Sequence, residues 1–144
     1  MTIIISESLV EKITKLKKAV KESNIEDIVT LVKAGAPTDA EIGAVPMLLY
    51  AAQREMWDVV EEFFILGADM DIKYNILDWT LIHQLASSGQ DEKLENYLPF
   101  INNKNQIEKS KGRNALMIAI LSDKRSTFDI LKEANLEIRC TDKD

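Results

Sequence analysis

The chain has 144 residues, 46% apolar and 29% charged, which fits one folded domain and excludes a disordered chain. Its net charge of −6 argues against bulk nucleic-acid binding and favours a basic protein partner. Cys140 is the single cysteine, so no internal disulfide can form, and no window approaches the roughly 18 apolar residues of a membrane span. We expect a cytoplasmic, reducing environment and no membrane insertion.

Two capping patterns predict the first pair of helices. Ser8 to Glu11 should begin a long helix with apolar residues at helical spacing and a basic face of lysines. Ser23 to Glu26 repeats the pattern and predicts a second helix, which Gly35 ends in the left-handed position. The longer first helix is typical of the N-terminal cap of a stack.

A short connector, 36–45, leads to the second pair. Pro46 is predicted as the first helical residue, where its missing N–H has no cost. The return helix starts at Trp57 and stops at Gly67. The small pair Ala51 and Ala52 requires another helix to cross close by.

The third and fourth pairs follow the connectors 68–79 and 102–113. Polar residues predict where their four helices begin: Thr80, Asp91, Asn114 and Ser126. Pro99 should bend or stop the return helix of the third pair. Asn135, which tolerates the left-handed conformation, takes the place of glycine at the last stop.

These segments recur at a constant step. Pro46, Thr80 and Asn114 lie 34 residues apart, and the stops at Gly67, 101–103 and Asn135 keep the same interval. A period in the low thirties with two short helices in each period predicts a stacked helical repeat.

The repeat resembles the ankyrin family, whose pattern is Gly-x-Thr-Pro-Leu-His-x-Ala-Ala followed by a return helix and Gly-Ala-Asp. In the third repeat Thr80 and His83 match, and Ile82 fills the leucine place. Further matches occur in all four repeats: Ala86, Gly89, Gly112, Leu116, Ala119, Val59-Val60, Gly67-Ala68-Asp69 and Gly35-Ala36. The resemblance implies an all-α solenoid of about four helix-turn-helix repeats joined by short hairpin-like connectors.

The resemblance covers residues 8–144 and implies one ankyrin-repeat domain over 1–144. The expected repeats are 8–35, 36–67, 68–101 and 102–135, with 136–144 leading into a possible further repeat. The chain ends where that repeat would begin. It is therefore either part of a longer protein, or a partner or a second copy covers the uncapped C-terminal end, which makes self-association an open alternative.

Departures from the family pattern predict a less stable array with weak coupling between some repeats. Leu49 and Met117 occupy the histidine place, which leaves His83 as the single candidate for the family's cross-repeat hydrogen bond. Glu55 and Asp123 replace glycine at the turn between the two helices of a repeat.

Catalytic and metal constellations are missing from the sequence. His83 and Cys140 lie 57 residues apart without a third group to orient a base, so we interpret His83 as structural. One histidine and one cysteine cannot form a zinc site, and Asp69-Met70-Asp71 lacks the rest of a calcium loop. We predict a chain that is not an enzyme and needs no cofactor. Loss of function in a folded His83→Ala variant would revive the enzyme alternative.

One connector is rich in large apolar residues, although connectors at this position are normally polar. Residues 74–79 place four large apolar side chains within six positions: Tyr74, Ile76, Leu77 and Trp79. In the ankyrin family the hairpin tips and first helices line the binding surface, and exposed aromatic clusters anchor interfaces. The alternative is that these side chains fold back over the neighbouring repeat.

The family pattern adds polar positions to this surface: Gln53, Arg54, Ser87, Ser88, Lys111 and Arg113. This local surface would suit an acidic or amphipathic segment, whereas the net charge favours a basic partner. The local charge should decide specificity because distant exposed charges are screened beyond about 8 Å.

We therefore expect a protein-protein interaction module that binds another protein through its concave face and hairpin tips. One expected use of such a module is as the recruiting domain of a larger protein. The alternative is a stand-alone acidic inhibitor of the immunity type that occludes a basic partner such as a toxin.

Overall fold

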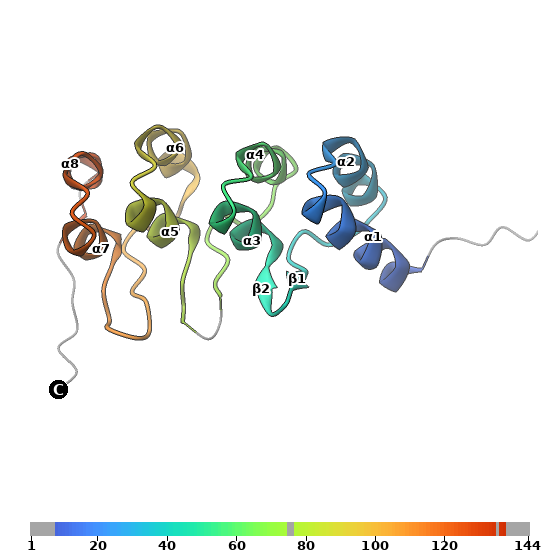
Figure 1. Ribbon diagram of the computed structural model, residues 1–144, viewed down its shortest axis with the longest axis horizontal. Coiled ribbons are helices and arrows are strands. Elements are labelled where there is room, and N and C mark those ends of the chain that lie inside the picture. Colours follow the sequence, from blue (N-terminus) through green and yellow to red (C-terminus); the bar gives the residue numbers. More distant parts are fainter. Residues whose placement is uncertain (1–7, 75–76, 135, 138–144) are drawn as a thin grey trace, which may run out of the picture. The chain divides into compact units, whose positions relative to one another are not determined.

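The structure, a computed structural model, describes residues 8–74, 77–134 and 136–137 (Figure 1). The described part contains eight α-helices, one short 3₁₀ turn and one two-stranded hairpin, which confirms the all-α fold class. Contacts divide the chain into two compact units, Met1–Asp69 and Met70–Asp144, each holding two helix pairs. The single domain and its repeat boundaries stay predictions. No described helix is both long enough and apolar enough to cross a membrane.

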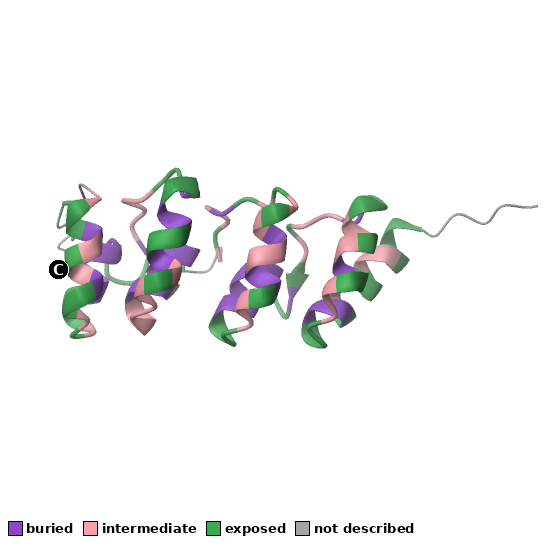
Figure 2. Ribbon diagram, turned by 90° about the horizontal axis from the view of Figure 1, so that it is seen from above, coloured by how far each residue is buried: buried purple, intermediate pink, exposed green. Residues whose placement is uncertain are grey.

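The first unit consists of two helix pairs and a hairpin between them. Its elements are α1 Leu9–Lys21, α2 Ile25–Lys33, β1 Glu41–Ile42, β2 Val45–Pro46, α3 Met47–Gln53 and α4 Trp57–Ile65. Helix α1 packs on α3 and α2 packs on α4. Ala51 and Ala52 are buried, as the predicted close approach of another helix requires. Figure 2 shows that each of these helices carries both buried and exposed residues.

The helix caps of the first pair match the sequence prediction once and differ once. Ser8 Oγ accepts a hydrogen bond from the N–H of Glu11 at 3.1 Å, so the predicted cap of α1 is confirmed. The prediction of Ser23 as the cap of α2 was wrong. The cap is Asn24, whose Oδ1 accepts from the N–H of Asp27 at 3.2 Å. Ser23 has φ 55° and forms the left-handed turn between the helices, which leaves the capping position to its neighbour.

The connector of the first unit is a tight hairpin. Its strands pair Glu41 with Pro46 and Ile42 with Val45, and two residues make the turn. Both have positive φ, 57° at Gly43 and 68° at Ala44, as the turn that matches strand twist demands. Pro46 was predicted as the first helical residue, but its ψ of 140° is extended and α3 starts at Met47.

The second unit holds the third and fourth helix pairs. Its elements are α5 Leu81–Ser88, α6 Asp91–Tyr97, the 3₁₀ turn η1 Leu98–Phe100, α7 Ala115–Leu121 and α8 Arg125–Glu133. Helix α5 packs on α7 and α6 packs on α8. Helix α6 gives way to the 3₁₀ turn beside Pro99, which confirms the predicted stop. Thr80 and Asn114 occupy the caps of α5 and α7 as predicted.

Two other predicted caps in this unit were wrong. Asp91 and Ser126 lie inside α6 and α8, and Gln90 and Lys124 precede those helices. The carboxylate of Asp91 instead accepts hydrogen bonds from the hydroxyls of Ser126 and Thr127, which ties α6 to α8. These polar side chains therefore join two helix pairs by hydrogen bonds and do not cap their own helices. Asn135, the predicted last stop, lies outside the described residues.

Candidate partner-binding site

Hydrogen bonds link Tyr74 to Leu77 and Trp79 at the tip of the third connector. The N–H of Tyr74 donates to the carbonyl of Trp79 at 2.8 Å, and the N–H of Leu77 donates to the carbonyl of Tyr74 at 3.0 Å. Asp78 supports this loop with φ 51°. Leu77 is 38% exposed, while Tyr74 is half-buried. Ile76 lies outside the described residues, so Leu77 carries the exposed apolar surface of the described loop.

Trp79 is held against helix α5. Its Nε1–H donates to Oε1 of Gln84 at 3.2 Å, and its ring centroid lies 5.1 Å from that of His83. The side chain is half-buried. Trp79 thus anchors the connector to helix α5.

His83 joins helix α5 to the fourth connector. Its Nδ1 accepts from the N–H of Thr80 at 3.0 Å and also contacts the Thr80 hydroxyl. Nε2 therefore carries the ring proton and donates to the carbonyl of Gln106 at 2.7 Å. Burial lowers the pKa of His83 to about 4, against the opposite effects of the Gln106 carbonyl and the charge of Glu108. A buried, neutral imidazole with both nitrogens engaged has a structural role, as the sequence indicated.

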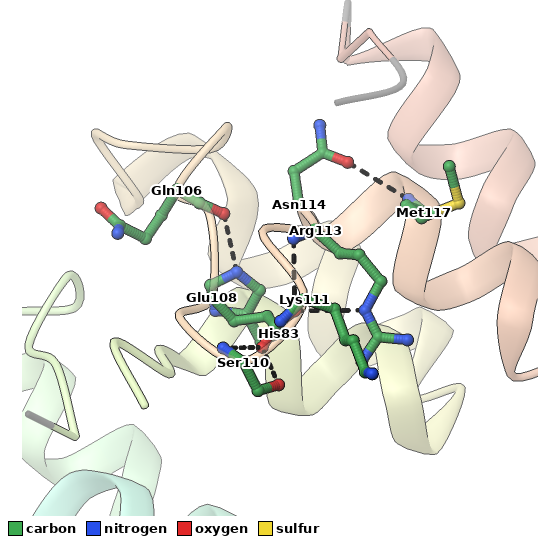
Figure 3. Close-up of polar contacts among 8 residues, drawn as sticks. All are labelled: His83, Gln106, Glu108, Ser110, Lys111, Arg113, Asn114 and Met117. Carbon is green, nitrogen blue, oxygen red and sulfur yellow. Dashed lines mark hydrogen bonds and ion pairs between the residues drawn. The ribbon is translucent and has the colours of Figure 1, made fainter. Parts of the chain in front are cut away.

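The fourth connector is organised around the carboxylate of Glu108 (Figure 3). One oxygen accepts from the N–H and hydroxyl of Ser110 at 2.9 and 2.5 Å. The other accepts from the N–H of Lys111 at 3.0 Å and from the N–H and Nε–H of Arg113 at 3.2 and 3.1 Å. Burial alone would raise the pKa of Glu108, but these donors together lower it to about 2. The loop therefore wraps an ionised side chain.

Hydrogen bonds fasten the fourth connector to the third connector and to helix α5. The carboxylate of Asp71 accepts from the N–H groups of Asn102 and Asn103 at 3.0 and 2.8 Å. Farther along, the carbonyl of Gln106 receives the Nε2–H of His83 (Figure 3). At the tips, the N–H of Lys109 donates to the carbonyl of Leu77 at 2.7 Å. The two tips therefore form one continuous surface.

This surface, termed the tip surface, combines one apolar side chain with cations. The tip surface exposes Leu77, Lys109 and Lys111. Neither lysine ammonium contacts a carboxylate among the described residues. Arg113 is half-buried and paired with Glu108. The members of the tip surface are Tyr74, Leu77, Trp79, Lys109, Lys111 and Arg113.

The remaining predicted site residues lie on helices. Gln53 and Arg54 are exposed at the end of α3 in the first unit, where the Arg54 guanidinium lies 3.7 Å from the centroid of the Tyr50 ring. Ser87 and Ser88, at the end of α5 in the second unit, are half-buried and donate their hydroxyls to the carbonyl of Gln84 at 3.1 and 2.7 Å. Their role in partner binding stays a prediction.

The last helix pair carries a second apolar feature. This feature is a groove of about 270 Å³ with an apolar and a charged part. It is lined by Ala119, Ile120 and Phe128 and by the charged residues Asp123, Lys124, Arg125 and Asp129. Leu121, beside it in the sequence, is 59% exposed. Self-association through this end stays a prediction. No group of three or more potential metal ligands occurs in the described parts of the chain.

Sequence reasoning missed Glu108 and Lys109. The connector 102–113 was predicted as the link to the fourth helix pair, whereas its one acidic residue organises the loop. A lone carboxylate among four cations, with serine and glycine close behind it, is the signal that could have identified this role.

A comparison with known protein families supports this repeat architecture. A sequence model described as ankyrin repeats (3 copies) matches residues 48–144. The chain belongs to the ankyrin-repeat family. None of the curated proteins compared with it matches. Ankyrin repeats are generally protein-protein interaction modules and are typically non-catalytic, which agrees with the general function predicted from the sequence.

Proposed function

We propose that this ankyrin-repeat chain binds a protein partner through the tip surface of its second unit. The observation that carries the proposal is the exposure of Leu77 beside two exposed lysines, on two connectors that hydrogen bonds join. Isolated exposed apolar residues are ordinary, but this one lies on a loop that polar residues would normally occupy.

Rigidity supports binding at this position. The Glu108 carboxylate fixes the backbone from Ser110 to Arg113, and the Lys109 to Leu77 hydrogen bond fixes the two tips relative to each other. A surface that is ordered before binding loses little conformational entropy on association, so modest contacts give measurable affinity.

The test is capture of partners by the wild-type chain and a Leu77→Asp variant, followed by mass spectrometry. Leu77 is preferable to Trp79 because Trp79 also holds the connector to α5. Ile65→Asp on α4 is the matched control, since Ile65 is 72% exposed. A partner lost with Leu77→Asp and kept with Ile65→Asp supports the proposal, provided that circular dichroism shows equal folding. A partner retained by all three proteins contradicts it.

The same experiment addresses the alternative of an acidic inhibitor, which rests on the net charge of −6. A basic partner would bind the carboxylates of the return helices and keep its affinity in the Leu77→Asp variant. Recruitment within a larger protein is compatible with tip binding and does not alter the design.

A further inference from the structure

The charge of the tip surface differs in sign from that of the whole chain. Residues 104–113 contain four cations, Lys104, Lys109, Lys111 and Arg113, against one carboxylate, Glu108, which gives a local net charge of +3 within a chain of −6. Positive charge is therefore concentrated on one connector of an acidic protein.

The one carboxylate of this connector is not available to neutralise the exposed lysines. Glu108 is 1% exposed and both of its oxygens are occupied by Ser110, Lys111 backbone and Arg113 donors. Figure 3 shows the Lys111 side chain extending away from the carboxylate that holds its own backbone. Asp78, next to Leu77, is half-buried and is the one acidic side chain of the described third-connector loop.

The apolar contact and the cations are adjacent. Because the Lys109 N–H binds the Leu77 carbonyl at 2.7 Å, the Leu77 side chain and the two lysines are presented together. A partner that fills this surface needs an apolar group for Leu77 and carboxylates within reach of Lys109 and Lys111. Opposite charges across an interface raise the association rate and exclude partners of the wrong sign.

Resting on the proposed function, we infer that the partner segment is a short acidic peptide stretch with at least one apolar side chain. A long polyanion, such as a nucleic acid or an anionic membrane, would extend beyond the tip and meet the acidic remainder of the chain. A short segment avoids that repulsion because exposed charges farther away than about 8 Å are screened at physiological salt.

The test uses a random dodecapeptide library displayed on phage and selected on the full chain. We expect the selected peptides to be acidic with an apolar residue, and their affinity, measured by fluorescence anisotropy, to fall as sodium chloride is added. Double substitution of Lys109 and Lys111 should weaken binding about tenfold. Both Lys→Glu and Lys→Gln pairs are made, because the neutral pair does not place a new carboxylate beside Glu108. The control is Lys33→Glu with Lys132→Glu, two exposed lysines on α2 and α8.

Each outcome decides between the inference and the function on which it rests. The acidic partner is supported if binding is lost in the tip lysine variants and kept in the control. Peptides whose Glu and Asp are replaced by Gln and Asn should lose binding to the wild-type chain as well. Binding lost with Leu77→Asp but kept in the lysine variants, or selection of uncharged peptides, rejects the acidic partner and leaves the tip surface as the site. Binding that survives every tip variant, or a failure to select any peptide, counts against both. Tighter binding of a thymidine oligonucleotide or of phosphatidylserine vesicles than of the peptides would also overturn the inference.

Discussion

His83 and Glu108 show how two buried ionisable side chains fix the connectors of the second unit. Each is held in one protonation state: His83 is neutral because burial lowers its pKa, and Glu108 is ionised because donors surround it. Both pKa values lie below their ordinary values, so both groups resist protonation in the folded chain.

We expect folding stability to fall as the pH drops through the range in which unfolded histidine takes up a proton. The pKa of His83 is 6.5 when unperturbed and about 4 when folded, so its contribution is complete above pH 6.5 and is lost as the pH falls from 6.5 to 4. Between pH 7.5 and 5 the free energy of unfolding should decrease by about 2 kcal/mol. Urea titrations at pH 7.5 and pH 5 measure this decrease in the free energy of unfolding.

The control is unusually direct because the chain has one histidine. A His83→Asn variant should be less stable at pH 7.5 but show little further change down to pH 5. An unchanged pH slope in that variant would contradict the assignment to His83. Below pH 4.5 Glu108 adds a second loss, since its lowered pKa means that stability is present above 4.5 and disappears as the pH falls toward 2.

Replacing Glu108 by glutamine should destabilise the second unit by about 2–3 kcal/mol, because the amide keeps the volume but sets an NH₂ group against buried N–H donors. Thermal unfolding followed by circular dichroism measures the loss. Glu95→Gln on α6 is the matched control, since Glu95 is exposed. Equal melting temperatures for the two variants would show that the carboxylate does not organise the loop.

At the scale of elements, the hairpin of the first unit contains a strained position. Ala44 has φ 68° beside Gly43 at 57°, and an L-residue with a Cβ is disfavoured there by about 1 kcal/mol. Ala44→Gly should therefore raise the free energy of unfolding by about 1 kcal/mol, and Gly43→Ala should lower it by a similar amount. A Cβ at Gly43 would meet no atom within 4 Å, so backbone strain and not crowding sets the second effect.

Urea denaturation of both variants and of Ala34→Gly distinguishes strain from a general effect of glycine. Ala34 has φ −81° at the end of α2, where glycine gains nothing. Stabilisation by both glycine substitutions, or by neither, would contradict the strain at Ala44.

The sequence predicted those elements whose determinants are local. The three confirmed caps have extended backbone themselves and precede their helices directly, so the residue type was sufficient: Ser8, Thr80 and Asn114. The wrongly predicted caps have the same chemistry but different surroundings. Ser23 forms the left-handed turn between two helices. The carboxylate of Asp91 accepts hydrogen bonds from Ser126 and Thr127 of another helix pair. The Glu108 network was out of reach because its donors converge only after the loop has closed.

At the scale of the whole molecule, each compact unit has its own buried core. Phe63 and Leu48 are buried in the first unit, and Leu85, Leu94 and Leu116 in the second. In repeat proteins, stability is approximately a sum of repeat and nearest-neighbour terms, so one unit can lose structure while the other keeps it. The departures from the family pattern at Leu49 and Met117 favour such uneven stability.

The two tryptophans report the units separately, since Trp57 lies in α4 and Trp79 precedes α5. Single-tryptophan variants, Trp57→Phe and Trp79→Phe, allow each unfolding transition to be followed by fluorescence in urea. Phe63→Ala in the first unit should cost about 3–5 kcal/mol of stability. We expect it to shift the midpoint reported by Trp57 and to leave that reported by Trp79 nearly unchanged. A common shift of both midpoints would instead show that the four helix pairs unfold as one cooperative body. The prediction of weak coupling between repeats would then be wrong.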